Sequence, residues 1–160
     1  MLVDAMHTCC FLGHREIVET QALRLQLYNV LERLIIEQQI DCFLFGSKSQ
    51  FIYLCYEIVT ELKNYHPHIK RIYVRAEFPQ IGEDYRRYLL SRYEDTYYPE
   101  KIIGAGRAVY IKRNAEMINK SRFCVFYYED AYVPKERKSG TKIALDYAVK
   151  HKKEIIRVTL

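Results

Sequence analysis

The stretch CCFLGHRE, Cys9–Glu16, begins as an apolar run and ends in Gly13, His14 and Arg15. A short run without polar interruption is typical of a strand that is buried on both faces, and a glycine at its end is typical of a turn. Strands of this kind occur in parallel sheets that helices cover on both sides. The rest of the sequence supports the same interpretation.

Strand-like and helix-like segments alternate along the chain. Strands are expected at Thr8–Leu12, Asp41–Phe45, Ile69–Ala76, Phe123–Tyr128 and Glu154–Thr159, and helices at Thr20–Gln38, Gln50–Asn64, Gly82–Tyr93, Arg107–Lys120 and Thr141–Lys150. The first helix shows the pattern well, because Leu23, Leu27, Leu31 and Leu34 recur at helical spacing. The alternation predicts an α/β fold: a three-layer sandwich with a mainly parallel central sheet. No linker interrupts it, so residues 1–160 are expected to form a single domain.

Composition and charge narrow the function classes. Hydrophobic residues make up 49% of the 160 residues and charged residues 28%, which is ordinary globular composition. The net charge is +5, and much of the excess lies in two short runs, at 135–138 and 150–153. A nucleic-acid-binding protein usually concentrates more cations on one face. A solvated surface is therefore the favoured interpretation of these runs, and an anionic small ligand is compatible with them.

The 5 cysteines and the N-terminal sequence argue against a zinc-binding protein and a secreted protein. No CxxC pair is present, so a structural zinc site is not expected, and buried reduced thiols are the simplest account. The first residues, MLVDAMHTCC, contain neither the cationic nor the long apolar region of a secretory signal. No apolar stretch is long enough to span a membrane. These observations predict a soluble, cytoplasmic protein with no metal and no membrane partner.

Ligands of open parallel sheets bind beyond the carboxyl ends of the strands. The residues near those ends are therefore the candidates for binding. They are Gly13, His14 and Arg15 after the first strand, Gly46 and Ser47 after the second, Glu77 after the third, Arg113 and Asn114 on the helix before the fourth, and Ser139, Gly140 and Thr141 where the last helix begins.

These residue types share a chemical logic. Glycine allows a backbone to approach an anion closely, and a helix N-terminus offers N–H groups and the positive end of a dipole. Arginine binds phosphate through its planar guanidinium, and a carboxylate such as that of Glu77 accepts hydrogen bonds from ribose hydroxyls. Together they suit a phosphorylated ribose or a nucleotide as ligand, with no further cofactor. Neither GxGxxG nor GxxxxGK[ST] is present.

Each residue also has a purely structural interpretation, which the sequence leaves open. Gly13 and the pair Gly46 and Ser47 could simply form turns, and His14 could be a satisfied turn residue. Arg15 could pair with Glu16 or Glu19, Arg113 could pair with Glu116, Glu77 could belong to a surface ion pair, and Asn114 could face water. Ser139, Gly140 and Thr141 could be only a helix cap.

Three segments resemble a known family when they are read together. CCFLGHR at 9–15 resembles the CCFTGHR opening of YpsA-like proteins, which belong to the SLOG superfamily (named for the SMF/DprA and LOG families). RNAEMINKSRFCVFYY at 113–128 and SGTKIALDYA at 139–148 resemble later segments of the same family, and all three occur in the expected order. The resemblance implies a Rossmann-like fold that binds nucleotide-derived ligands. It implies binding roles for Gly13, His14, Arg15, Gly46, Arg113, Asn114, Gly140 and Thr141, and it implies a homo-oligomer.

The sequence also departs from its apparent relatives. Ser47 stands where the family often has a second glycine, and Ile52 where it often has an acidic residue. LOG phosphoribohydrolases carry an essential glutamate in Gly-Gly-x-Gly-Thr-x-x-Glu, and Ala144 occupies that position here. N-glycosidic cleavage requires a carboxylate near the ribose, so this activity is disfavoured unless Glu77 replaces the missing group.

Three hypotheses follow. The first is a module that binds or senses a molecule of the ADP-ribose or cyclic ADP-ribose type without turning it over, with a protein effector as a conceivable partner. The second is a nucleotide hydrolase or phosphoribohydrolase of LOG type, with Glu77 as its catalytic candidate. The third is binding of single-stranded nucleic acid, as in DprA; the 15 tyrosines offer stacking surface, but the modest charge makes nucleic acid the least favoured partner.

Overall fold

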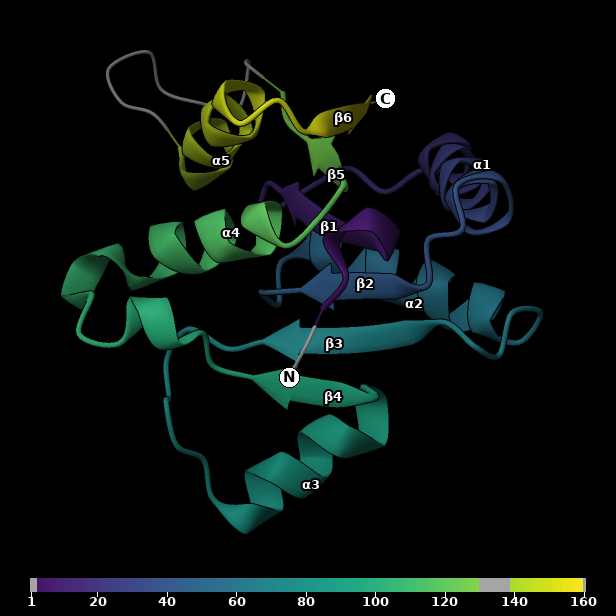
Figure 1. The fold of residues 1–160 in the computed structure, drawn as a ribbon. Coiled ribbons are helices and arrows are strands. Elements are labelled where there is room, and N and C mark those ends of the chain that lie inside the picture. Colours follow the sequence, from purple (N-terminus) through teal and green to yellow (C-terminus); the bar gives the residue numbers. More distant parts are fainter. Residues whose placement is uncertain (1–2, 130–138, 160) are drawn as a thin grey trace.

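The computed structural model describes residues 3–129 and 139–159 (Figure 1). The strands are β1 (Thr8–Gly13), β2 (Cys42–Phe45), β3 (Lys70–Val74), β4 (Asp95–Tyr97), β5 (Phe123–Tyr127) and β6 (Glu154–Val158). The helices are α1 (Gln21–Glu37), α2 (Gln50–Lys63), α3 (Glu83–Arg92), α4 (Val109–Asn119) and α5 (Gly140–Lys150). Short 3₁₀ helices occupy Ala5–His7, Glu100–Ile102 and Gly106–Ala108. The cationic run at 135–138, which precedes α5, lies outside the described residues.

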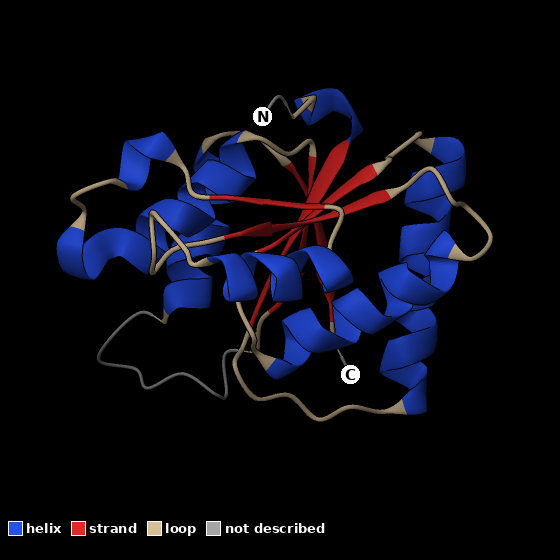
Figure 2. Cartoon of the chain, turned by 90° about the horizontal axis from the view of Figure 1, so that it is seen from below, coloured by secondary structure: helices blue, strands red, loops and turns tan. Residues whose placement is uncertain are grey.

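The strands form one sheet in the order β4-β3-β2-β1-β5-β6, and every strand pair is parallel. The predicted α/β fold is confirmed, and the sheet is parallel throughout its described strands rather than mainly so. Helices lie on both sides of the twisted sheet, as Figure 2 shows, which gives the three layers of a Rossmann-like sandwich. Within the described residues, no helix has the length and apolar character needed to cross a membrane.

Side chains alternate between two cores because successive residues of a strand point to opposite faces. On β1, Cys9 and Phe11 join the core beneath α1, α2 and α3, whereas Cys10 and Leu12 join the core beneath α4 and α5. Cys9 and Cys10 therefore point to opposite faces of the sheet. All five cysteines are buried and free, and burial raises the pKa of the Cys9 thiol well above its ordinary value.

The chain runs outward from β1 through β2 and β3 to β4, and then returns to place β5 on the other side of β1. The connections from β1 and β5 consequently diverge to opposite sides of the sheet. This divergence opens a crevice at the carboxyl ends of the strands, where open α/β sheets bind their ligands.

The sequence did not predict β4. No strand is expected between Tyr93 and Pro99. The structure instead pairs Asp95–Tyr97 with β3 at the edge of the sheet. Thr96 is buried, and its hydroxyl donates to the carbonyl of Tyr73 at 2.8 Å. Three residues with a polar centre carry too little periodicity to predict a strand.

Candidate functional site

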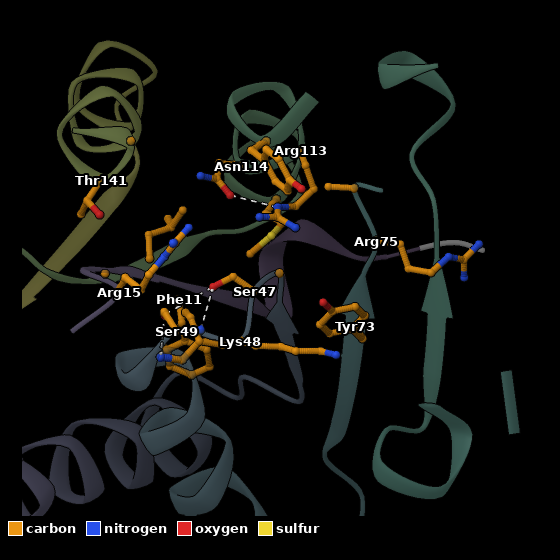
Figure 3. Close-up of a pocket in the computed structure, with 18 of the residues that line it drawn as sticks. Phe11, Arg15, Ser47, Lys48, Ser49, Tyr73, Arg75, Arg113, Asn114 and Thr141 are labelled. Atoms are coloured by element: carbon orange, nitrogen blue, oxygen red, sulfur yellow. Dashed lines mark hydrogen bonds between the residues drawn. The ribbon is translucent and has the colours of Figure 1, made fainter. Parts of the chain in front are cut away.

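A pocket of about 840 Å³ lies at the carboxyl ends of the strands. It is lined by every residue that the sequence proposed for binding: Gly13, His14, Arg15, Gly46, Ser47, Glu77, Arg113, Asn114, Ser139, Gly140 and Thr141. The fold thus brings together segments that are more than a hundred residues apart. Figure 3 shows Arg15, Ser47 and Arg113 reaching the pocket from three different parts of the chain.

Arg113, on α4, is the most deeply buried cation of the pocket, with only 5% of its surface exposed. Its Nε donates to Oδ1 of Asn114 at 3.0 Å, and its Nη1 donates to the carbonyl oxygen of Val74 at 3.4 Å. No carboxylate of the described residues pairs with it; Glu116, the partner that the sequence left open, lies near Lys101 instead. Burial lowers the pKa of Arg113, but a guanidinium remains charged at neutral pH.

Gly46, which follows β2, leaves the space that Arg113 occupies. A Cβ at this position would lie 2.8 Å from Arg113 Nε and 2.5 Å from Met117 Sδ. Any larger residue would therefore push the guanidinium out of place. Gly46 is more than a plain turn residue, because its lack of a side chain is what allows the arginine to lie against the backbone.

The residues of the loop after β1 both pack against the rest of the fold and line the pocket. Gly13 packs against α2: a Cβ there would lie 2.3 Å from the ring of Phe51. Nε2 of His14 accepts a hydrogen bond from the N–H of Glu129 at 2.8 Å, so the proton of the neutral ring lies on Nδ1. Burial lowers the pKa of His14, which favours that neutral form. His14 thus ties this loop to the segment that follows β5.

Arg15 is exposed on the same loop, at the edge of the pocket. The sequence left open a pairing with Glu16 or Glu19. Neither occurs among the described ion pairs, and Glu19 pairs with Arg24 at 3.1 Å. No described carboxylate therefore pairs with the guanidinium of Arg15.

Two helix N-termini contribute to the pocket. Ser49 caps α2 by accepting from the N–H of Ile52 at 3.3 Å, and Ser47 Oγ lies 3.4 Å from Ser49 Oγ. Ser139 caps α5 by accepting from the N–H of Lys142 at 3.0 Å. The structural interpretation of Ser139 as a cap is thus correct, and it is compatible with pocket lining by Gly140 and Thr141.

Glu77, in the loop after β3, is the only carboxylate among the described residues that line the pocket. It is exposed, and its Oε1 accepts from the hydroxyl of Tyr110 at 2.8 Å. It belongs to none of the described ion pairs, so the surface ion pair considered for it is not observed. The hydrogen bond raises the pKa of Tyr110 and joins the loop after β3 to the first turn of α4.

Sequence reasoning missed several lining residues: Phe11, Leu12, Lys48, Ser49, Ile52, Tyr73, Arg75, Ala76, Phe78, Tyr85, Tyr110 and Met117. Lys48 lies within the second loop, so the rule that singled out the other candidates would have found it. Arg75 fell inside the strand expected at Ile69–Ala76, which in the structure already ends at Val74. Tyr110 precedes Arg113 by one helical turn and shares its face. The aromatic residues of β1, β3 and α3 had no such signal, because packing and ligand contact require the same residue types.

Arg75 has a structural task within the pocket wall. Its guanidinium donates to the carbonyl oxygens of Phe78 and Pro79, both at 3.3 Å, and to Thr96 Oγ1 at 3.2 Å. It points away from Arg113 and Arg15 (Figure 3). These contacts attach the loop that carries Glu77 to the edge of the sheet.

Ala144 lies on α5 with only 4% of its surface exposed and belongs to the core beneath that helix. It does not line the main pocket; it lines a small cavity of about 30 Å³ between α4 and α5. The position at which the LOG motif carries its glutamate therefore holds a packing residue here.

Comparisons with known proteins add no assignment. The sequence matches no model of a protein family, and a search of curated proteins found no similar sequence.

Proposed function

We propose that the pocket binds a nucleotide-derived small molecule through its phosphate groups, as a sensor or a sequestering protein, and does not turn it over. The observation that carries this proposal is the buried guanidinium of Arg113, which has no carboxylate partner among the described residues. A buried charge without a counter-ion is costly, and proteins rarely retain one without a use. An anionic ligand would supply the missing charge.

The charges around Arg113 favour the same class of ligand. Arg15, Lys48 and Arg75 also line the pocket, whereas Glu77 is the single described carboxylate. An excess of cations in a crevice attracts anions and strengthens their binding. Gly140 and Thr141, at the N-terminus of α5, add backbone N–H groups and the positive end of a helix dipole. These features together suit phosphate oxygens, which only accept hydrogen bonds.

The remaining lining suits the base and sugar of a nucleotide. Aromatic surface comes from Tyr73 of β3, Phe78 of the loop after it, Tyr85 of α3 and Tyr110 of α4. Glu77, in the same loop as Phe78, offers an acceptor for hydroxyl or amino groups. A volume of about 840 Å³ lies within the range of small-molecule sites. The resemblance of 9–15, 113–128 and 139–148 to YpsA-like sequences supports a ligand of the ADP-ribose or cyclic ADP-ribose type.

We propose that the ligand is not turned over because the described lining of the pocket contains a single carboxylate, that of Glu77. N-glycosidic cleavage develops positive charge on the ribose, which a nearby carboxylate must stabilise. Ala144 is buried in the core, and Glu77 is exposed at the edge of the pocket with one oxygen occupied by Tyr110.

The test is retention of a nucleotide panel. The protein is incubated with AMP, ADP-ribose, NAD and cyclic ADP-ribose isomers at millimolar concentration, separated by filtration, and both fractions are analysed by mass spectrometry. We expect one compound to be retained unchanged. Arg113→Ala should lose the retention, and Arg33→Ala, which removes the same charge from the exposed surface of α1, should keep it. No retention of any compound by the wild type would reject the proposal.

The LOG-type hydrolase is the second candidate, because Glu77 does line the pocket. In that case free base and ribose phosphate would appear in the same experiment. Glu77→Gln should then abolish turnover while binding persists. Turnover that is equal in the variant and the wild type would exclude Glu77 as the catalytic residue.

A further inference from the structure

The side-chain amide of Asn114 is the closest polar partner of the buried guanidinium. Asn114 Oδ1 accepts from Arg113 Nε at 3.0 Å, and Arg113 Nη1 donates at 3.4 Å to the carbonyl of Val74. Both acceptors are neutral. The guanidinium is therefore held by two hydrogen bonds and has no direct carboxylate partner among the described residues; Glu77 acts on it only through its charge, without a contact.

The chemistry of the contact fixes the orientation of the amide. Arg113 Nε can only donate, so the atom of Asn114 that faces it must be the oxygen. The nitrogen Nδ2 then points to the other side, and no described residue accepts a hydrogen bond from it. Asn114 lines the pocket together with Arg113. The two side chains thus present N–H donors to the pocket and no acceptor.

The contact is not the usual one for neighbouring helix residues. Consecutive side chains of an α-helix point about 100° apart and do not normally face each other. Here the guanidinium turns back toward Asn114, and the absent side chain of Gly46 leaves it room, since a Cβ there would lie 2.8 Å from Nε. Tyr110 closes another side, with its ring centre 5.8 Å from the guanidinium carbon. Figure 3 shows the dashed contact between Arg113 and Asn114.

We propose that Asn114 is the positioning residue that makes this pocket selective for anions: its amide orients Arg113 without neutralising it. This inference rests on the proposed function, since it names the residue that keeps the phosphate-binding charge available. A carboxylate in the same place would accept the same hydrogen bond and would also supply the counter-ion. The charge of residue 114 therefore decides whether the site still needs an anion from solution.

The substitution Asn114→Asp tests this directly, because it changes the amide nitrogen to oxygen and leaves the size of the side chain unchanged. The new carboxylate should pair with Arg113, raise the melting temperature and lower the affinity for phosphate-bearing compounds by at least about tenfold. Asn29→Asp, at an exposed position of α1, introduces the same charge far from the pocket and should change neither quantity. Retention is measured with the panel of AMP, ADP-ribose, NAD and cyclic ADP-ribose isomers, and melting is followed by circular dichroism.

A second variant separates positioning from general structural support. Asn114→Ala removes the acceptor and adds no charge, so Arg113 loses its orientation; both affinity and melting temperature should fall. The inference thus predicts opposite changes of the melting temperature for the aspartate and the alanine variants. A residue with only a structural role would lower the melting temperature in both.

The outcomes distinguish this inference from the proposed function. If the wild type retains a compound and Asn114→Asp retains it equally well, the role of Asn114 is rejected and the proposed function stands. If Asn114→Asp loses retention but also melts at a lower temperature than the wild type, the internal ion pair is rejected. If the wild type retains none of the compounds, the proposed function is rejected, and this inference with it.

Discussion

At the scale of single residues, the pocket depends on a charge that the protein buries without pairing. Arg113 is 5% exposed, and its described partners are an amide and a carbonyl. Desolvation of a charge without a counter-ion opposes folding, whereas the same charge strengthens binding of an anion. Stability and binding therefore place opposite demands on this residue, and substitutions should separate them.

We expect Arg113→Met to abolish binding with little loss of stability. Methionine fills similar space without charge, so relief from desolvation offsets the two lost hydrogen bonds, and the free energy of unfolding should change by no more than about 1 kcal/mol. Urea denaturation measures this quantity. A loss of several kcal/mol would mean that the guanidinium stabilises the fold, and Arg113 would then be a structural residue.

Gly46→Ala should lower affinity by moving Arg113. The added Cβ would lie 2.5 Å from Met117 Sδ and 2.8 Å from Arg113 Nε, and overpacking of this kind costs about 1–3 kcal/mol. Gly82→Ala is the matched control, because nothing lies within 4 Å of its Cβ position. Titration calorimetry with ADP-ribose compares the two variants. Equal affinity in both would show that binding does not depend on where Arg113 lies.

At the scale of elements, one carboxylate joins three parts of the fold at the amino ends of β3 and β4, at the opposite end of these strands from the pocket. Glu94, just before β4, accepts from Arg71 Nε at 3.0 Å on β3 and pairs with Lys63 at 3.0 Å at the end of α2. Burial alone would raise the pKa of Glu94, but the hydrogen bonds from Arg71 and Lys63 outweigh it and lower that pKa. The edge strand β4 is held to the sheet in part by this cluster.

The lowered pKa of Glu94 predicts how the stability of the protein depends on pH. A carboxyl group whose pKa is lower in the folded state than its ordinary value of 4.5 stabilises the protein at pH values above 4.5. That contribution disappears as the pH falls and the carboxylate becomes protonated in the folded protein. Glu94→Gln should therefore lower stability at neutral pH and reduce its decline below pH 4.5. Thermal melts of both proteins between neutral and acidic pH measure the difference. Parallel curves would exclude Glu94 as a source of the acid sensitivity.

Elements with strong patterns could be predicted, and weakly patterned ones could not. The apolar runs of β1, β2 and β5 and the spacing of leucines in α1 determined the alternating order. β4 could not be predicted from the sequence, because Asp95, Thr96 and Tyr97 form neither an apolar run nor a clear alternation of apolar and polar residues. Its burial comes from pairing with β3, which is a tertiary contact that no local pattern records.

At the scale of the whole molecule, the position of the pocket follows from the topology. β1 lies between β2 and β5, and the connections that follow β1 and β5 run to opposite sides of the sheet, so a crevice opens where these two connections diverge. This is why the segments at 13–15, 46–47 and 113–114 could be assigned to one site from the sequence. The partners within the site could not be assigned in this way. The hydrogen bonds from Arg113 to Asn114 and from Tyr110 to Glu77 depend on side-chain orientation.

The measurement that tests the central claim most directly is a crystal structure of the protein grown with ADP-ribose. The account predicts electron density in the pocket, with a phosphate oxygen within hydrogen-bonding distance of the Arg113 guanidinium and the base near Tyr73 and Tyr85. An empty pocket at saturating ADP-ribose, or a phosphate bound away from Arg113, would contradict it.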